Sequence, residues 1–445
     1  MLGECKRQVL SNGLRVLGVQ NPALHSFVCS VYIGGGALFE TQDQAGLSHF
    51  VEHMILQGSE HFPTSRVLMR SVEELGGIVD AGTYAEYINV FCLAHRKHWP
   101  RAMEIASDVL LRPLFTPDEI EQEKRIIAQE ISPHRDRAGR NISPMELTHC
   151  IAFRGQVWES GTRGSRATLQ RFDKLTVERR YRQFFTPGNM VVCLAGGLDF
   201  EEVLGKVEKS FGCLTAGEPA PAAPAAPVPG PAGRARAFYR PTEALPVAEA
   251  VLCFYAYPLA HERFDACRAV NHLLGAGLSS RLFTRVREEL GLVYDVQSHL
   301  QGYAAAGMLE VVLSVSVENL VDAVRATLEV IRQAAADGFT AAELERYKET
   351  ARCGMDMLCD SAASLADWFG RHELILGPDG AFTPRYYVRR QEALTLEGVN
   401  AVARELMADS GATFVVVGPY GDAEADALRR LLPAEELSPS PEPNG

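Results

Sequence analysis

The alternation of hydrophobic and polar residues divides most of the chain into short strands and amphipathic helices. In the first half, period-two alternation and short apolar runs predict strands over residues 7–19, 26–34, 78–94 and 189–196. An Asn12-Gly13 turn splits the first of these into a hairpin. Apolar spacings of three and four predict helices near 44–57, 64–75, 97–112, 116–137 and 199–211. Strands grouped with long helices predict an α+β fold, an open sheet covered by helices.

One low-complexity stretch interrupts this pattern. The segment GEPAPAAPAAPVPGPAG, residues 217–233, alternates Pro and Ala and cannot build a core, which is typical of a linker. We therefore predict an N-terminal domain over residues 1–216 and a C-terminal domain over residues 234–435. The last residues, 436–445, are predicted to be a flexible tail.

The two predicted domains share a divergent repeat. Three segments recur in the same order in both halves. They are HFVEH (49–53) with RAVNH (268–272), FTPDEIEQEK (115–124) with FTAAELERYK (339–348), and LTVE (175–178) with LTLE (394–397). Each half also ends in a strand, a glycine and a short acidic-led helix. This order favours a duplicated domain. The second copy lacks the first histidine and the glutamate, so only the first half would carry the chemistry.

The segment GLSHFVEHMILQG, residues 46–58, places three polar side chains on one side of an otherwise apolar helix. His49 and His53 stand one helical turn apart, and Glu52 lies on the same side. Catalytic zinc takes three protein ligands, and a glutamate beside the second histidine can act as general base. The simpler alternative is a histidine pair satisfied by Glu52 alone.

A second helix offers a third ligand. The segment TPDEIEQEKRIIAQEISP opens with Thr116-Pro117 and acidic residues, which are helix-start signals. Glu123 and Glu130 are seven residues apart on it and share one face. Glu123 can equally be a surface acid that pairs with a neighbouring basic residue.

The motif H-x-x-E-H, followed by Glu130 after 76 intervening residues, resembles the pitrilysin and mitochondrial processing peptidase family of zinc metallopeptidases. The resemblance extends to LSNGLRV, LGGIVDAGTYAEYINV and SSRLFTRVREELGLVYDV, which cover nearly the whole chain in the family's order. It implies one Zn²⁺ per chain, bound by His49, His53 and Glu130. It also implies that Glu52 is the general base and that Glu123 is an acid supporting the ligands.

The resemblance further implies that Arg287 and Tyr294, which belong to the C-terminal domain, bind the substrate. It also implies that the edge strand carrying Asp80 and Ala81 holds the substrate in an extended conformation. The simpler alternative makes RVREEL a solvated helix face and Tyr294 an inward-packing strand residue. Two departures bear on substrate preference: Asp80 stands where the family usually has Asn, and Gln57 replaces a common basic residue.

Composition narrows the class of protein. Of the 445 residues, 47% are hydrophobic and 22% are charged, and no apolar run is long enough to span a membrane. A net charge of −12 disfavours nucleic acid as a partner and predicts faster cleavage of basic peptides. Ten cysteines without a CxxC pair, and a start without a secretory layout, predict a cytoplasmic protein.

The resemblance thus implies a zinc metalloendopeptidase that hydrolyses peptides or unfolded polypeptide segments through a metal-activated water. The chain resembles the short, two-domain bacterial members, which pair as clam-shell dimers. Because one chain carries both the zinc residues and the arginine–tyrosine pair, a homodimer is preferred, and a heterodimer with a related subunit stays open. Two alternatives also remain: a maturation peptidase dedicated to one peptide, and a non-catalytic assembly subunit.

Overall fold

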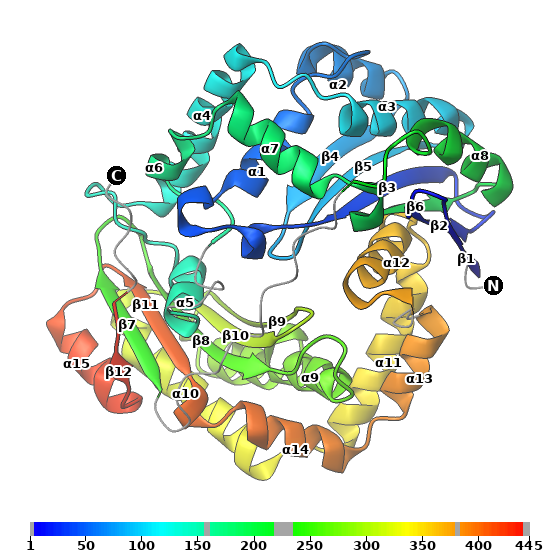
Figure 1. The fold of residues 1–445 in the computed structure, drawn as a ribbon. Helices are drawn as coiled ribbons and strands as arrows, with labels where there is room; N and C mark the ends of the chain where they lie inside the picture. Colours follow the sequence, from blue (N-terminus) through cyan, green and yellow to red (C-terminus); the bar gives the residue numbers. More distant parts are fainter. Residues whose placement is uncertain (1–3, 155–160, 218–234, 379–382, 439–445) are drawn as a thin grey trace. The chain divides into compact units, whose positions relative to one another are not determined.

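The computed structural model describes residues 4–154, 161–217, 235–378 and 383–438. The predicted linker, except Gly217, and the predicted tail from residue 439 onward lie outside the described residues. The chain divides into two units (Figure 1), each made of three segments. Unit 1 contains Met1–Glu130, Thr162–Pro224 and Cys353–Val388, and unit 2 contains Ile131–Gly161, Ala225–Arg352 and Arg389–Gly445.

Unit 1 is built on a six-stranded sheet with the strand order β1-β2-β6-β3-β5-β4. The strands are β1 (Glu4–Val9), β2 (Arg15–Gln20), β3 (Ser26–Gly34), β4 (Ile78–Thr83), β5 (Tyr87–His95) and β6 (Met190–Gly196). All neighbours are antiparallel except β2 and β6. The predicted hairpin is confirmed, and its turn places Gly13 at a φ of 89°, a left-handed conformation that favours glycine.

Helices cover both faces of this sheet. The helices of unit 1 are α1 (Leu47–Ile55), α2 (Ser65–Glu73), α3 (Trp99–Leu111), α4 (Pro117–Ile131), α6 (Arg166–Leu169), α7 (Lys174–Phe184), α8 (Phe200–Phe211) and α12 (Ala362–Leu376). Helices α3 and α8 pack on strands of the sheet, and α12 covers the other face through Leu365, Ala366 and Phe369. The buried apolar residues of α12 thus complete a core that begins near the N-terminus.

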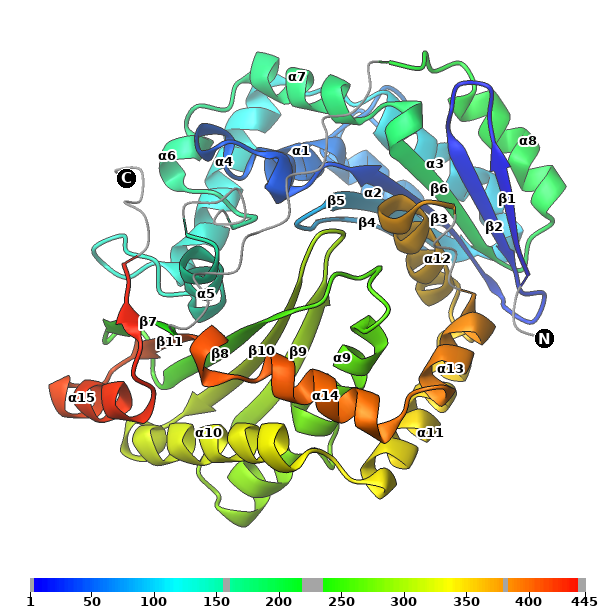
Figure 2. The ribbon, with the colours of Figure 1, turned by 60° about the horizontal axis from the view of Figure 1, so that its bottom comes forward.

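Unit 2 repeats the arrangement with the strand order β12-β7-β11-β8-β10-β9. Its strands are β7 (Arg236–Pro241), β8 (Ala248–Ala256), β9 (Asp295–Gly302), β10 (Gly307–Val315), β11 (Thr413–Gly418) and β12 (Glu435–Glu436). Figure 2 shows α10 and α14 along one face of this sheet. The helices that contribute to the unit are α5 (Pro144–Ala152), α9 (Phe264–Asn271), α10 (Leu320–Asp337), α11 (Ala341–Leu358), α13 (Pro384–Glu392), α14 (Leu396–Leu406) and α15 (Asp422–Leu431).

The predicted duplication is confirmed by the topology. Five strands of one sheet, β2-β6-β3-β5-β4, correspond in order and direction to β7-β11-β8-β10-β9 of the other. Helix α1 follows β3 just as α9 follows β8, which places HFVEH and RAVNH at equivalent points. The α+β fold of two related, mainly antiparallel sheets is therefore confirmed.

Each unit also contains a helix from the other half of the sequence. Helix α5, from the first half, packs in unit 2 through Leu147 and Ile151 against Val415 and Val417 of β11. Helix α12, from the second half, packs in unit 1. The compact units therefore differ from the two continuous sequence segments on either side of the Pro/Ala-rich stretch.

Most predicted elements of the first half are present, with local differences. The segment 78–94 forms two strands rather than one, and the predicted helix 116–137 ends at Ile131. Pro133 disfavours helical backbone at the residue before it and lacks an N–H for a helical bond, so a short 3₁₀ turn follows. Helices α5 and α7 were not predicted.

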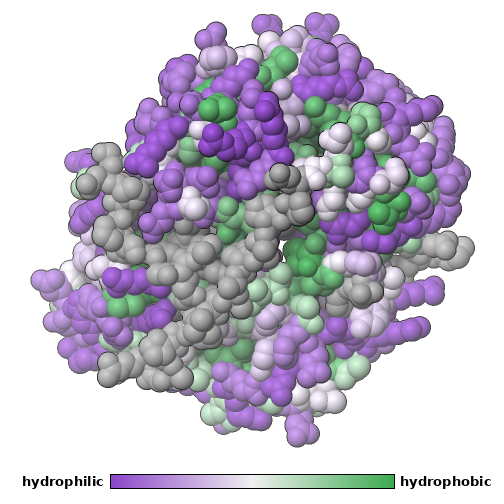
Figure 3. Space-filling model, in the orientation of Figure 1, coloured by the Kyte–Doolittle hydropathy of each residue, from purple (hydrophilic) through white to green (hydrophobic). Residues whose placement is uncertain are grey.

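In the part of the chain that the structure describes, no helix combines the length and the apolar character that crossing a membrane requires. Hydrophilic side chains cover most of the face seen in Figure 3, and hydrophobic residues form separate patches there.

Candidate metal centre

Helix α1 separates a buried apolar face from a polar one. Phe50, Met54 and Ile55 are fully buried and anchor the helix in unit 1. On the polar face, the Nε2 atoms of His49 and His53 lie 3.1 Å apart, and the two rings meet edge to face. Two imidazole nitrogens therefore point at one position, as the spacing in the sequence predicts.

Helix α4 brings a carboxylate to the same position. Glu130 Oε2 lies 3.7 Å from the Nε2 atoms of both His49 and His53. Ligand atoms about 2.0–2.2 Å from zinc in a tetrahedron lie about 3.3–3.6 Å from one another. The observed separations of 3.1 and 3.7 Å bracket this range. The three groups thus fit a zinc ion in donor type and in spacing.

Glu123, on α4, contacts the ring nitrogen of His53 that faces away from the other donors. Its side chain is buried, and Oε2 lies 3.1 Å from His53 Nδ1. The imidazole that donates Nδ1–H to this carboxylate keeps the lone pair of Nε2 available for a metal. The alternative of an exposed acid is excluded by the burial of Glu123, and Lys124 pairs with Glu121 instead.

The protonation states of the two histidines are set differently. Burial, together with the neighbouring charges of His53 and Arg163, lowers the pKa of His49 to about 3, so His49 is neutral and can donate a lone pair. Burial also lowers the pKa of His53, but its hydrogen bond to Glu123 and the charges of Glu52 and Glu130 outweigh this effect and raise it.

The Glu52 carboxylate lies next to the imidazoles of His49 and His53. This carboxylate and the two imidazoles offer atoms that all lie within 4.8 Å of one another. Thr83 Oγ1, at the end of β4, lies 3.3 Å from Glu52 Oε2. Burial raises the pKa of Glu52 to about 7, although the charge of His53 and the hydrogen bond from Thr83 lower it. A carboxylate with a pKa near neutrality is suited to accept and return a proton.

Strand β4 forms the edge of the sheet next to this site. Among the strands that the structure describes, it pairs with β5 alone, as the predicted edge strand requires. Asp80 is exposed, its Oδ1 accepts a hydrogen bond from the backbone N–H of Ala81 at 2.9 Å, and its charge raises the pKa of Glu52. The last residue of this strand, Thr83, was missed in the sequence because nothing local marks its contact with Glu52.

Arg287 and Tyr294 lie together in unit 2, whereas the donors lie in unit 1. The Arg287 guanidinium lies 6.0 Å from the centre of the Tyr294 ring, and its Nη1 lies 4.0 Å from Asp295 Oδ1. Tyr294 is 84% exposed, so the alternative of an inward-packing strand residue is wrong. Both side chains are available to bind a ligand at the surface of unit 2.

The equivalent point of unit 2 lacks such a donor set. Arg268 and Asn271 stand where unit 1 has His49 and Glu52, and Arg268 pairs with Asp265 at 3.5 Å. His272 keeps the second histidine but lies against the ring of Tyr347, with 5.3 Å between ring centres. Tyr347 occupies the place of Glu123 in the repeat. Among the described residues of unit 2, no three potential metal-ligating side chains come together in this way.

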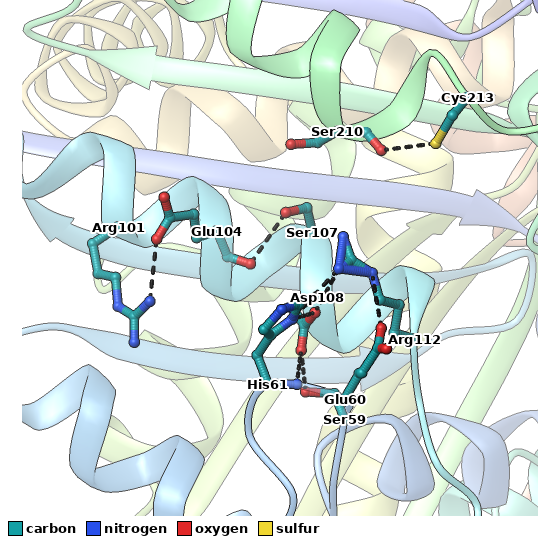
Figure 4. A network of polar contacts seen from close by, with 10 residues as sticks. All are labelled: Ser59, Glu60, His61, Arg101, Glu104, Ser107, Asp108, Arg112, Ser210 and Cys213. Atoms are coloured by element: carbon teal, nitrogen blue, oxygen red, sulfur yellow. Dashed lines mark hydrogen bonds and ion pairs between the residues drawn. The ribbon is translucent and has the colours of Figure 1, made fainter.

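A polar cluster fixes the chain segments next to the two ligand helices (Figure 4). Asp108, near the end of α3, accepts hydrogen bonds from Ser59 Oγ at 2.7 Å, from the backbone N–H of His61 at 3.0 Å and from His61 Nδ1 at 2.6 Å. The backbone N–H of Glu60 also donates to the carbonyl of Arg112 at 3.1 Å. The cluster joins the segment after α1 to the end of α3, shortly before α4 begins.

Comparison with known proteins places this geometry in a family. The family model described as "Insulinase (Peptidase family M16)" matches residues 15–164, and the one described as "Peptidase M16 inactive domain" matches residues 172–351. A Mycobacterium tuberculosis protein named as an uncharacterized zinc protease is 30% identical over 437 residues, 97% of this chain and 95% of its own length. A Bacillus subtilis protein with the same description is 28% identical over 433 residues, 94% of this chain and 99% of its own.

A solved structure agrees at the level of the fold. The crystal structure of a protease from Helicobacter pylori superimposes with a TM-score of 0.84 at 18% identity and covers 94% of this chain and all of that one. Together with the two family models, the 30% identity over nearly the full length is decisive. The chain belongs to peptidase family M16, the insulinase family, as its resemblance to pitrilysin and the mitochondrial processing peptidases predicted.

Proposed function

We propose that the chain is a zinc-dependent endopeptidase that hydrolyses peptides or unfolded polypeptide segments. The observation that supports it most is the convergence of His49, His53 and Glu130 from two helices, with Glu52 beside them. In this proposal His49, His53 and Glu130 hold one zinc ion per chain. When bound, zinc supplies a Lewis acid for the scissile carbonyl and makes a water molecule more acidic.

Glu52 acts as the general base in this proposal. It accepts a proton from the attacking water and returns it to the leaving amine, so no proton is gained or lost overall. Its burial and its position beside Thr83 support the assignment. Glu123 orients His53 through the 3.1 Å contact to Nδ1.

The substrate would bind in an extended conformation along β4. Its free edge can add a peptide as a further strand, with Asp80 and Ala81 next to the bound segment. Arg287 and Tyr294 would bind carbonyl or carboxylate oxygens of the peptide, and the exposure of Tyr294 supports this role.

The family resemblance further supports a homodimer. The absence of disulfides among the ten cysteines, all of which lie in described residues, supports a cytoplasmic location.

A non-catalytic subunit is the second candidate, because the family model over residues 172–351 describes an inactive domain. The donor set argues against it, since it lies within the segment that matches the other model, apart from the inactive-domain match.

The test combines metal content with cleavage of a mixed peptide library. Wild-type protein should hold about one zinc per chain and cut peptides; Glu130→Gln should lose zinc, and Glu52→Gln should keep zinc and lose hydrolysis. Glu121→Gln is the matched control, because this carboxylate lies on α4 but is exposed. The proposal fails if wild-type protein holds no zinc, or if Glu52→Gln and Glu130→Gln both cleave at the wild-type rate.

A further inference from the structure

We propose that Glu40 is a positioning residue for the metal site: its buried carboxylate orders the first turn of α1 and thereby holds His49 in place. The inference rests on the proposed function, because it takes His49 as a zinc ligand. Glu40 itself lies seven residues before the motif helix and belongs to no motif in the sequence.

The first turn of α1 lacks a local cap. His49 is only the third residue of the helix, so its position depends on a turn whose backbone N–H groups have no partners within the helix. The N-cap residue is Gly46, which has no side chain to accept them. Its φ of 87° disfavours other residues, and a Cβ there would lie 2.6 Å from the carbonyl oxygen of Arg163. A capping group must therefore come from another part of the chain.

Glu40 supplies this cap. Its Oε2 accepts a hydrogen bond from the backbone N–H of Gly46 at 2.7 Å, and its Oε1 accepts one from the N–H of Ser48 at 2.5 Å. The residue is 6% exposed, so water cannot readily replace it. A carboxylate at the N-terminal end of a helix also interacts favourably with the helix dipole.

Arg180 holds both the loop that precedes Glu40 and the first turn of α1. From α7 this buried guanidinium donates to the carbonyls of Gly36 at 3.2 Å and Phe39 at 3.0 Å, immediately before Glu40. It also donates to Ser48 Oγ at 2.7 Å, next to His49. The Arg180 side chain thus connects the loop that carries Glu40 with the first turn of α1. Burial raises the pKa of the Glu40 carboxyl, and the positive charge of Arg180 opposes this by favouring the ionised form.

The second histidine does not depend on this cap. His53 lies one turn further along α1, and its ring is held by Glu123 of α4. Loss of Glu40 should therefore release His49 while His53 and Glu123 stay in place. This asymmetry separates a positioning role from a general loss of stability.

The test measures the zinc dissociation constant of the full-length chain by competition with a chelator. Glu40→Gln keeps the shape of the side chain but turns an amide NH₂ toward one of the two backbone N–H donors. We expect the dissociation constant to rise about tenfold or more, the range seen when groups that support metal ligands are lost. The matched control is Glu373→Gln, since Glu373 is also buried in unit 1 but pairs with Arg7 at 3.0 Å. This control should stay within about twofold of wild type.

A spectroscopic measurement checks the geometry directly. With Co²⁺ in place of zinc, the visible absorption reports the number and arrangement of ligands, and it should change for Glu40→Gln but not for Glu373→Gln. If Glu40→Gln does not fold, Ser48→Ala removes only the hydroxyl that contacts Arg180 and should still raise the dissociation constant about threefold.

The outcomes are distinguishable from those of the proposed function. If wild-type protein binds no zinc, the proposed function fails, and this inference fails with it. If wild-type protein binds zinc and Glu40→Gln binds it equally well with the same cobalt spectrum, only the positioning role is overturned. Equal losses of affinity in Glu40→Gln and Glu373→Gln would also overturn it, because the effect would then be one of general stability.

Discussion

Replacing Asp108 by alanine should destabilise unit 1 by about 2–4 kcal/mol. The Asp108 side chain is 4% exposed, and its two oxygens accept three hydrogen bonds. In the alanine variant, the hydroxyl of the fully buried Ser59 and the backbone N–H of His61 lose their acceptor. A fully buried polar group left unpaired costs about 1–3 kcal/mol, and the N–H of the exposed residue His61 is taken at the lower end, about 1 kcal/mol, which gives the total of about 2–4 kcal/mol. The contact to the His61 ring adds little, because that side chain is 63% exposed and its charge is screened by water.

The assay follows hydrogen–deuterium exchange in increasing urea, read on peptides from unit 1. A local readout is needed because a chain of two units need not unfold in one step. The matched control is Glu104→Ala on the same helix, whose side chain is 45% exposed and pairs with Arg101 and Lys206. It should cost less than about 1 kcal/mol.

A double-variant cycle isolates the buried hydrogen bond. Ser59→Ala combined with Asp108→Ala should cost less than the sum of the two single variants, by about 1 kcal/mol or more, because each single change already removes the same bond. If Asp108→Ala lies within about 0.5 kcal/mol of wild type, or equals Glu104→Ala, the reasoning about burial is wrong.

Three further predictions concern metal and pH. Glu123→Gln should weaken zinc binding about 10–100-fold in chelator competition, while Glu121→Gln should not. Zinc at about 100 times its dissociation constant should stabilise wild-type protein by about 2.7 kcal/mol in thermal unfolding, and a chelator should remove this stabilisation. An equal stabilisation of Glu130→Gln by zinc would contradict the assignment of Glu130 as a ligand. In unit 2, burial raises the pKa of Glu343, but hydrogen bonds from Arg281 and Thr340 outweigh this and lower it to about 2 from an ordinary value of 4.5. Its ionised form therefore stabilises the fold fully above pH 4.5 and progressively less down to about pH 2, so the stability difference between wild type and Glu343→Gln should shrink over that range in urea unfolding.

The helices that carry the donors could be predicted because their apolar residues recur at helical spacing. His49, His53 and Glu130 followed from spacing together with the family resemblance, and the structure brings them together. The duplicated fold could be predicted because short segments recur in the same order in both halves.

The supporting residues could not be predicted, since their contacts join distant parts of the chain. Helix α7 is rich in arginine and shows little apolar periodicity, yet Arg180 from it is 5% exposed. Glu40 and Asp108 look like ordinary surface acids in the sequence, and only tertiary packing shows which backbone groups they satisfy. For the same reason, no local pattern in the sequence indicates that α5 packs in unit 2 and α12 in unit 1.

The placement of α12 has a consequence for how the protein is made. The last strand of the first sheet ends at Gly196, but the helix that covers one face of this sheet ends at Leu376, a difference of 180 residues. At roughly 5–20 residues per second, the ribosome needs on the order of 10–35 s to bridge that interval. During this time Val28, Val191 and Ala195 on the sheet have no covering helix from their own unit. Nascent chains that extend beyond residue 196 but not yet to residue 376 should therefore bind chaperones or aggregate, so unit 1 would reach its native state only after α12 has been synthesised.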